Sequence, residues 1–148
     1  MTQINCTFTH VNGLKSITIP GGVETVGNII GDTEEKISIV LLNGVKTIDA
    51  SAFSGCTGLV NITIPESVTN IGDSAFFGCT GLTTVTLPAN VVKVGESAFG
   101  GCKNLQTVKL LGGIEKMGQS VFSGCFSLTA VEISEGVKSL GYAVFDGC

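Results

Sequence analysis

The 148-residue sequence contains no arginine and no tryptophan, and it has only one histidine. All eight of its cations are lysines, and its net charge is −4. Nucleic-acid binding draws on clustered Lys and Arg that neutralise phosphates, so this composition argues against a nucleic-acid partner. No basic amphipathic run indicates a membrane surface, and no apolar run approaches the roughly 18 residues of a membrane-spanning helix. The expected partner is therefore a protein or a carbohydrate.

The sequence also lacks the residue sets of common catalytic and metal sites. A catalytic triad or a Cys-His pair needs converging side chains, and His10 is the only histidine. No CxxC pair is present for zinc, and no phosphate-binding glycine loop occurs. Asp49, Asp73 and Glu96 recur near one turn, but a calcium ion needs several oxygens at one place, so a solvated turn explains them better. We expect no catalytic residue, no cofactor and no metal ion.

A pattern of 23 residues recurs through most of the chain, and we call each copy a rung. Residues 82–104 read LTTVTLPANVVKVGESAFGGCKN, and similar text fills residues 59–81 and 105–127. In LTTVTLP the apolar residues alternate, which predicts a strand with Val85 and Leu87 inward and Thr84 and Thr86 outward. VVKVG predicts a second, shorter extended segment, and ESAF predicts a single helical or 3₁₀ turn.

One rung cannot bury its own apolar side, whereas stacked rungs can, because each inward residue lands on its equivalents above and below. The predicted fold is therefore mostly β with short 3₁₀ or helical turns: a solenoid with a parallel sheet and six rungs of about 23 residues. It occupies residues 14–148 as a single domain, and residues 28–35 break the pattern of the first rung. Residues 1–13 lie outside the repeat, and the alternation of Ile4, Cys6 and Phe8 predicts a strand that caps the first rung.

The repeat LxxVxLPxxVxxVGxxAFxGCxx resembles the BspA-like, or Treponema-type, class of leucine-rich repeats. The resemblance covers residues 14–148, with departures at Lys36, Leu42, Asp49, Leu111 and Ser134. It implies a curved stack whose concave face is a parallel sheet used for protein recognition, with no catalytic residues. It also implies a surface or secreted adhesin of a host-associated bacterium or protist. The sequence itself shows no signal peptide and names no compartment.

Five of the six cysteines recur at intervals of 23 residues, which stacks them in one column. They are Cys56, Cys79, Cys102, Cys125 and Cys148. Stacking would bring neighbours within disulfide distance, but parallel Cβ directions make closure awkward. We therefore interpret the column as buried thiols that act as small apolar residues at a turn. Cys6 lies outside the column and is the better candidate for a free thiol.

The outward positions of the predicted strands form a small polar face. The candidate ligand-binding residues are Thr63, Thr84, Thr86, Thr107 and Lys109. Such a face offers hydrogen bonds, but it lacks the Tyr, Trp and Arg anchors that dominate tight interfaces. Together with this face, the family resemblance implies a non-enzymatic module for protein binding or adhesion, whose partner is a host protein or a second copy of the chain.

Rungs 2 and 3, which span residues 36–58 and 59–81, depart from this polar face. Ile37, Val40 and Leu42 are predicted to face outward, and Val60 lies one rung above Ile37. A strand that is apolar on both sides indicates either a covered sheet or a contact patch. Cover by the loop at residues 28–35 and contact with a protein partner both stay open.

The last rung is a second candidate interface, because Leu128, Val131 and Val144 would lie at an open apolar end. Solenoids normally need a polar cap, and an uncapped parallel edge leaves N–H and C=O groups unpaired. We therefore predict self-association as a homodimer, unless a longer parent chain covers this end. The alternative function is a structural scaffold that assembles through its ends and has no dedicated ligand face.

Overall fold

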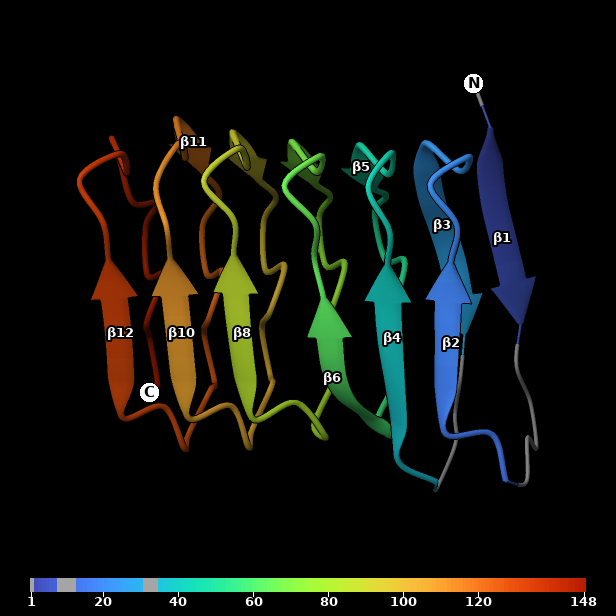
Figure 1. Cartoon of the computed structure of the whole chain (residues 1–148). Helices are drawn as coiled ribbons and strands as arrows, with labels where there is room; N and C mark the ends of the chain where they lie inside the picture. The colour runs from blue at the N-terminus through green and yellow to red at the C-terminus, as the bar shows by residue number, and fades with distance from the viewer. Residues whose placement is uncertain (1, 8–12, 31–34) are drawn as a thin grey trace.

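The computed structural model of the chain describes residues 2–7, 13–30 and 35–148. Two rows of strands run through these residues, one at the front of Figure 1 and one behind it. The front row holds β2 (Ser16–Ile19), β4 (Ile37–Leu41), β6 (Leu59–Thr63), β8 (Thr84–Leu87), β10 (Thr107–Leu110) and β12 (Ala130–Ile133). The back row holds β1 (Gln3–Thr7), β3 (Thr25–Ile30), β5 (Thr47–Ile48), β7 (Asn70–Ile71), β9 (Lys93–Val94) and β11 (Lys116–Met117). Paired strands are parallel, which confirms the predicted parallel solenoid.

Equivalent residues of consecutive rungs lie side by side. Val108 is in register with Val85 on one side and with Val131 on the other. Val85 and Val108 are buried, whereas Val131 in the last front strand is 37% exposed. Thr84 and Thr86 are exposed. The inward and outward directions predicted for this strand are therefore confirmed.

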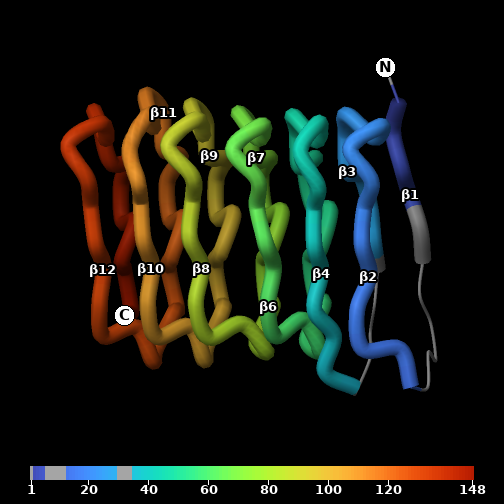
Figure 2. The backbone as a smooth tube through the Cα atoms, viewed as in Figure 1, coloured from blue at the N-terminus to red at the C-terminus, as the bar shows by residue number. Residues whose placement is uncertain are grey.

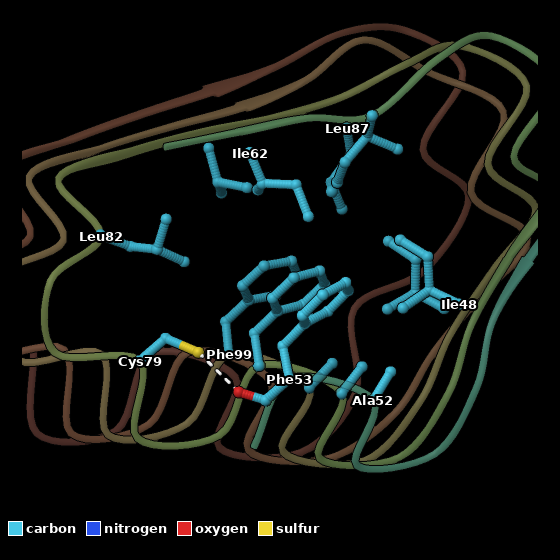
Figure 3. Close-up of a cluster of buried hydrophobic side chains, with 14 of the residues drawn as sticks. Ile48, Ala52, Phe53, Ile62, Cys79, Leu82, Leu87 and Phe99 are labelled. Atoms are coloured by element: carbon cyan, nitrogen blue, oxygen red, sulfur yellow. Dashed lines mark hydrogen bonds between the residues drawn. The ribbon is translucent and has the colours of Figure 1, made fainter. Parts of the chain in front are cut away.

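Stacked aromatic rings fill the centre of the solenoid. The fully buried rings belong to Phe53, Phe76, Phe99 and Phe122. Centroids of neighbouring rings are 5.1, 4.8 and 5.4 Å apart, and the ring planes are nearly parallel. Figure 3 shows the rings face to face in the middle of the core. Each rung thus buries its ring against its equivalents in the neighbouring rungs, which is how so short a unit obtains a core.

The corner after each back strand differs from the prediction. We expected a helical or 3₁₀ turn at ESAF, but the described residues contain no helix, and residues 96–101 form consecutive turns. Ser97 has a left-handed φ of 52°, which interrupts the right-handed run that a helix needs. Its N–H instead donates to the carbonyl oxygen of Gln119 in the next rung, at 2.9 Å.

Among the residues described, no helix is long and apolar enough to cross a membrane.

The first rung is irregular because its back strand is longer than the others. β3 continues to Ile30 and pairs with β1, with a register shift between Ile4 and Cys6. The predicted N-terminal strand is thus present at the edge of the back sheet, and its capping role stays a prediction. Phe8 and His10 lie outside the described residues, as do residues 31–34 of the predicted covering loop.

The front row is divided into two three-stranded sheets, β2-β4-β6 and β12-β10-β8. No ladder joins β6 to β8, although both strands are fully described, and Figure 2 shows the wider spacing between them. We call this break the seam. The back row is one continuous sheet in the order β1-β3-β5-β7-β9-β11. Rungs 3 and 4 are therefore paired by strands at the back but not at the front.

A bulge in β6 lies next to the seam, on the side of rung 2. Ile37 pairs with Leu59 and Ser38 pairs with Asn61, so Val60 is an extra residue on β6. A bulge bends and twists the strand that carries it, and Figure 1 shows β6 curving at its start. A bent β6 does not follow the path of β8. The same shift explains the departure at Lys36, because Ile37 takes the position opposite Leu59.

Candidate binding surfaces

The polar face predicted as a ligand site lies on β6, β8 and β10. Thr63, Thr84, Thr86 and Lys109 are exposed there, and Thr107 is half-buried. The Lys109 ammonium lies 3.5 Å from the carboxylate of Glu132, and at least half of each side chain is exposed. Such a surface ion pair contributes less than about 1 kcal/mol to stability, so both charges are available to a partner. Ligand binding by these five residues stays a prediction.

Two grooves follow the seam, and the sequence did not predict them. One, of about 310 Å³, is bordered by β6 and β8, and its polar lining includes Asn61, Thr63, Glu66, Thr84 and Thr86. The other, of about 680 Å³, is lined by Lys36, Thr57, Gly58, Val60, Gly81, Thr83, Asn104 and Gln106. The only sequence signal for them is the apolar Ile37 directly after Lys36, which marks the shifted register of rung 2.

The apolar patch predicted on rungs 2 and 3 is largely absent. Ile37 is only 7% exposed and belongs to the core, so its predicted outward direction is wrong. The cause is the regular alternation of β4, which puts Ile37 on the same inward face as Ile39, opposite Leu59. Val40 and Val60 are half-buried, and Leu42 is 45% exposed.

The C-terminal end exposes several apolar side chains. Val131, Ile133 and Leu140 are 37%, 48% and 44% exposed, and Leu128 is half-buried. Val144, however, is 4% exposed and packs in the core cluster, so its predicted place on an open surface is wrong. The corner turn that carries it directs the side chain inward.

Polar side chains at the corner bond between rungs. The Asp73 carboxylate accepts the N–H of Glu96 at 2.9 Å, and the Gln119 amide donates to the Glu96 carboxylate at 2.6 Å. Asp49 accepts a long hydrogen bond of 3.4 Å from Gln3. Within the described part of the chain, no group of three or more His, Cys, Asp or Glu side chains could hold a metal ion.

The cysteine column directs each thiol at a carbonyl oxygen of the preceding rung. Cys79 donates to Phe53 at 3.0 Å, as Figure 3 shows, and Cys125 donates to Phe99 at 3.3 Å. Cys79, Cys102 and Cys125 are buried and form no disulfide, as predicted, but their role as donors was missed. Burial raises the pKa of Cys102 and of Cys125 to about 12. At neutral pH these thiols are therefore protonated and poor nucleophiles.

A comparison with known protein families agrees with the periodic columns of buried residues and the parallel sheets. Residues 32–148 match the model of the BspA type leucine rich repeat region, with six copies. The chain belongs to the BspA-type leucine-rich repeat family. The matched span begins within the irregular part of the first rung.

Solved structures of leucine-rich repeat proteins resemble this BspA-type chain. One from T. pallidum is 26% identical, with a TM-score of 0.62, and the match covers 96% of this chain and 80% of that one. One from Bacteroides ovatus is 25% identical, with a TM-score of 0.61, and the match covers 90% of this chain but only 46% of that one. One from Eubacterium ventriosum, 19% identical with a TM-score of 0.53 over 90% of this chain and 64% of that one, shares the fold. No curated protein matches the sequence.

Leucine-rich repeats of the BspA type are typically non-enzymatic folds that interact with proteins. The coarse functional prediction of a protein-interaction module therefore agrees with the family. The columns of Phe and Cys account for the most regular letters of the BspA-type repeat, and both lie in the interior except at the last rung, where Cys148 is exposed. The outward positions, by contrast, vary from rung to rung.

Proposed function

We propose that the chain is a non-enzymatic protein-interaction module that binds its partner through the front face of β6, β8 and β10. The observation that carries this proposal is the row of exposed polar side chains at Thr63, Thr84, Thr86 and Lys109. The paired strands β8 and β10 hold Thr84, Thr86 and Lys109 at a fixed spacing of about 4.8 Å. Binding of a partner with a complementary row of polar groups therefore costs little conformational entropy, because these two strands are ordered before binding.

We further propose that this recognition serves adhesion, at the cell surface or outside the cell. The resemblance of the repeat to those of surface adhesins supports this setting. An enzymatic role has less support. In the column, the thiols of Cys79, Cys102 and Cys125 are buried donors, and an activated nucleophile needs an adjacent base or a lowered pKa.

The test is quantitative capture of partners by the immobilised protein from host-cell or matrix extract. The double variant Thr84→Glu/Thr86→Glu adds charge to the front face and should lower capture by about tenfold or more, which is about 1.4 kcal/mol of binding free energy. Lys93→Glu on the back strand β9 is the matched control and should leave capture unchanged. Circular dichroism checks that both variants fold. Equal capture by the front variant and the wild type would refute a role of this face.

The exposed C-terminal end favours a second function, self-association into a homodimer or a larger scaffold. Val131, Ile133 and Leu140 expose apolar surface next to the edge of β12, and burial of such surface against another copy is favourable. Light scattering should give a dimer for the wild type and a monomer for Val131→Asp/Ile133→Asp. Thr129→Asp, at an exposed polar position beside β12, should stay dimeric. A monomeric wild type at micromolar concentration would refute self-association.

A further inference from the structure

The seam is the one place where consecutive described rungs from rung 1 to rung 6 lack a front ladder. On its back side the two rungs stay joined, because Asn70 pairs with Lys93 and Ile71 pairs with Val94. At the corner the Phe76 N–H donates to the Ala98 carbonyl oxygen at 2.7 Å. Rungs 3 and 4 are therefore hinged at the back and unpaired at the front.

The edge of β8 at the seam presents main-chain groups that have no ladder partner. In a parallel ladder, alternate residues direct both N–H and C=O to the same neighbour. The carbonyl oxygens of Thr83 and Leu87 bond to β10, so the alternate residues Thr84 and Thr86 direct their N–H and C=O groups to the seam. Strand edges with unpaired groups are templates for pairing with another extended chain.

At the seam, the core of rung 3 is slightly more accessible than the core of rung 4. Ile62 and Ile64 of rung 3 are 6% and 9% exposed, whereas their equivalents in rung 4 are Val85 at 2% and Leu87 at 0%. Ile62 and Ile64 both line the groove of about 310 Å³. The inward side chains of an inserted chain would therefore contact the apolar core, and its outward side chains would lie next to the threonine hydroxyls of the front face.

The lining of the two grooves argues against a small-molecule ligand. No aromatic side chain lines either groove, and their walls are formed mainly by Thr, Asn, Gln and Gly with a few aliphatic residues. Small-molecule sites are instead enclosed and rich in apolar and aromatic side chains. An open groove bordered by unpaired main-chain groups fits a polypeptide better than a small molecule, because the N–H and C=O groups of a polypeptide repeat at the same interval as those of β8.

We propose that the seam takes an extended segment of a partner protein, inserted as a strand between β6 and β8. This inference rests on the proposed function, because it names how a protein partner is bound. One extra strand requires β6 and β8 to stand about 9.6 Å apart, twice the normal strand spacing. The two rungs open to this distance about the bonded pair β7–β9. The segment alternates apolar residues, which face Ile62 and Val85, with polar residues, which lie level with Thr63 and Thr86.

The first test uses hydrogen exchange of the unmodified protein. Without the peptide, the amides of Thr84 and Thr86 should exchange about tenfold or more faster than those of Thr107 and Lys109, which lie in the paired strand β10. The probe is a synthetic peptide with the sequence LTTVTLP, which has the required alternation. Its addition should slow exchange at Thr84 and Thr86. Equal protection of the two strands in the free protein, or no slowing with the peptide at high micromolar concentration, would overturn the proposal.

The second test locks the seam with a short, reducible cross-linker between two thiols. In a Cys148→Ser background, cross-linked Thr63→Cys/Thr86→Cys joins β6 to β8 and should weaken peptide binding about tenfold or more, with recovery on reduction. The control lock is Ser16→Cys/Ser38→Cys, which joins the paired strands β2 and β4 and should bind as before. Undiminished binding by the seam-locked protein would overturn the proposal. If the capture of partners still depends on Thr84 and Thr86 but the seam lock does not change peptide binding, recognition by the front face is supported and strand insertion is refuted.

Discussion

The thiol of Cys102 lies 3.2 Å from the carbonyl oxygen of Phe76, although 26 residues separate the two. The same carbonyl oxygen accepts the main-chain N–H of Cys79, also at 3.2 Å. One oxygen therefore ties the corner of its own rung to the thiol of the next. This double role explains why the corner uses a residue that is both small and able to donate a hydrogen bond.

The cysteine column should make the protein sensitive to alkaline pH. Burial raises the pKa of Cys102 to about 12, above the ordinary value of about 8.5, so the unfolded chain loses this thiol proton first as pH rises. The free energy of unfolding is therefore highest below about pH 8.5, and it falls by up to about 1.4 kcal/mol per pH unit for this thiol until pH reaches about 12.

Cys102→Ser provides the matched variant, because a hydroxyl can still donate to Phe76 but does not titrate in this range. Urea denaturation between pH 7 and pH 10.5 should show a shallower alkaline decline for Cys102→Ser than for the wild type. Identical slopes for the two proteins would show that the thiol does not govern the decline.

The ring column should contribute a large share of the stability. The rings of Phe76 and Phe99 are stacked with centroids 4.8 Å apart, and both are fully buried. Phe99→Ala should lower the free energy of unfolding by about 3–5 kcal/mol, because it removes buried surface and leaves a cavity inside the column. Phe77→Ala is the control in the same corner region. Since Phe77 is 48% exposed, its replacement should change stability by only about 0.5 kcal/mol, as measured by chemical denaturation.

Close contact between rungs should make one glycine hard to replace. A Cβ on Gly95 would overlap with the main-chain nitrogen of Asp73. Gly95→Ala should therefore cost about 1–3 kcal/mol or more, because neighbouring rungs must move apart. A Cβ on Gly22 would meet no atom within 4 Å, so Gly22→Ala should be nearly neutral. Comparable melting temperatures for the two variants would contradict the close approach at Gly95.

The left-handed corner should tolerate glycine and reject a β-branched side chain. Ser97 has a φ of 52°, a conformation that costs residues with a Cβ about 1–2 kcal/mol. Ser97→Val should destabilise by at least about 1 kcal/mol, whereas Ser97→Gly should be neutral or stabilising. Ser123→Val is the control, because Ser123 lies in an equivalent corner without a positive φ. The prediction fails if the valines at positions 97 and 123 have equal effects on thermal unfolding.

The repeat predicted the stacked core well because a short rung can bury its apolar side only against the rungs above and below it. Val85, Val108 and Val131 share one register, and the Phe rings form one stack. The prediction of a helical turn at ESAF failed because the left-handed φ of Ser97 is a main-chain property that its side chain does not reveal. The prediction for Ile37 failed because the inward alternation of β4 begins at this residue, one position later than the repeat places it. The prediction for Val144 failed because the corner turn decides its direction.

The sequence by itself determined the period, the parallel stack and the identity of the inward columns. These follow from in-phase apolar residues, which only their equivalents in the neighbouring rungs can cover. The tertiary structure alone decided where the front sheet breaks, which strand edges lack partners and which corner bonds join the rungs. These features depend on how the main chain of one rung lies against the next, and the pairing of β4 with β6 changes register at Val60 without disturbing the apolar pattern.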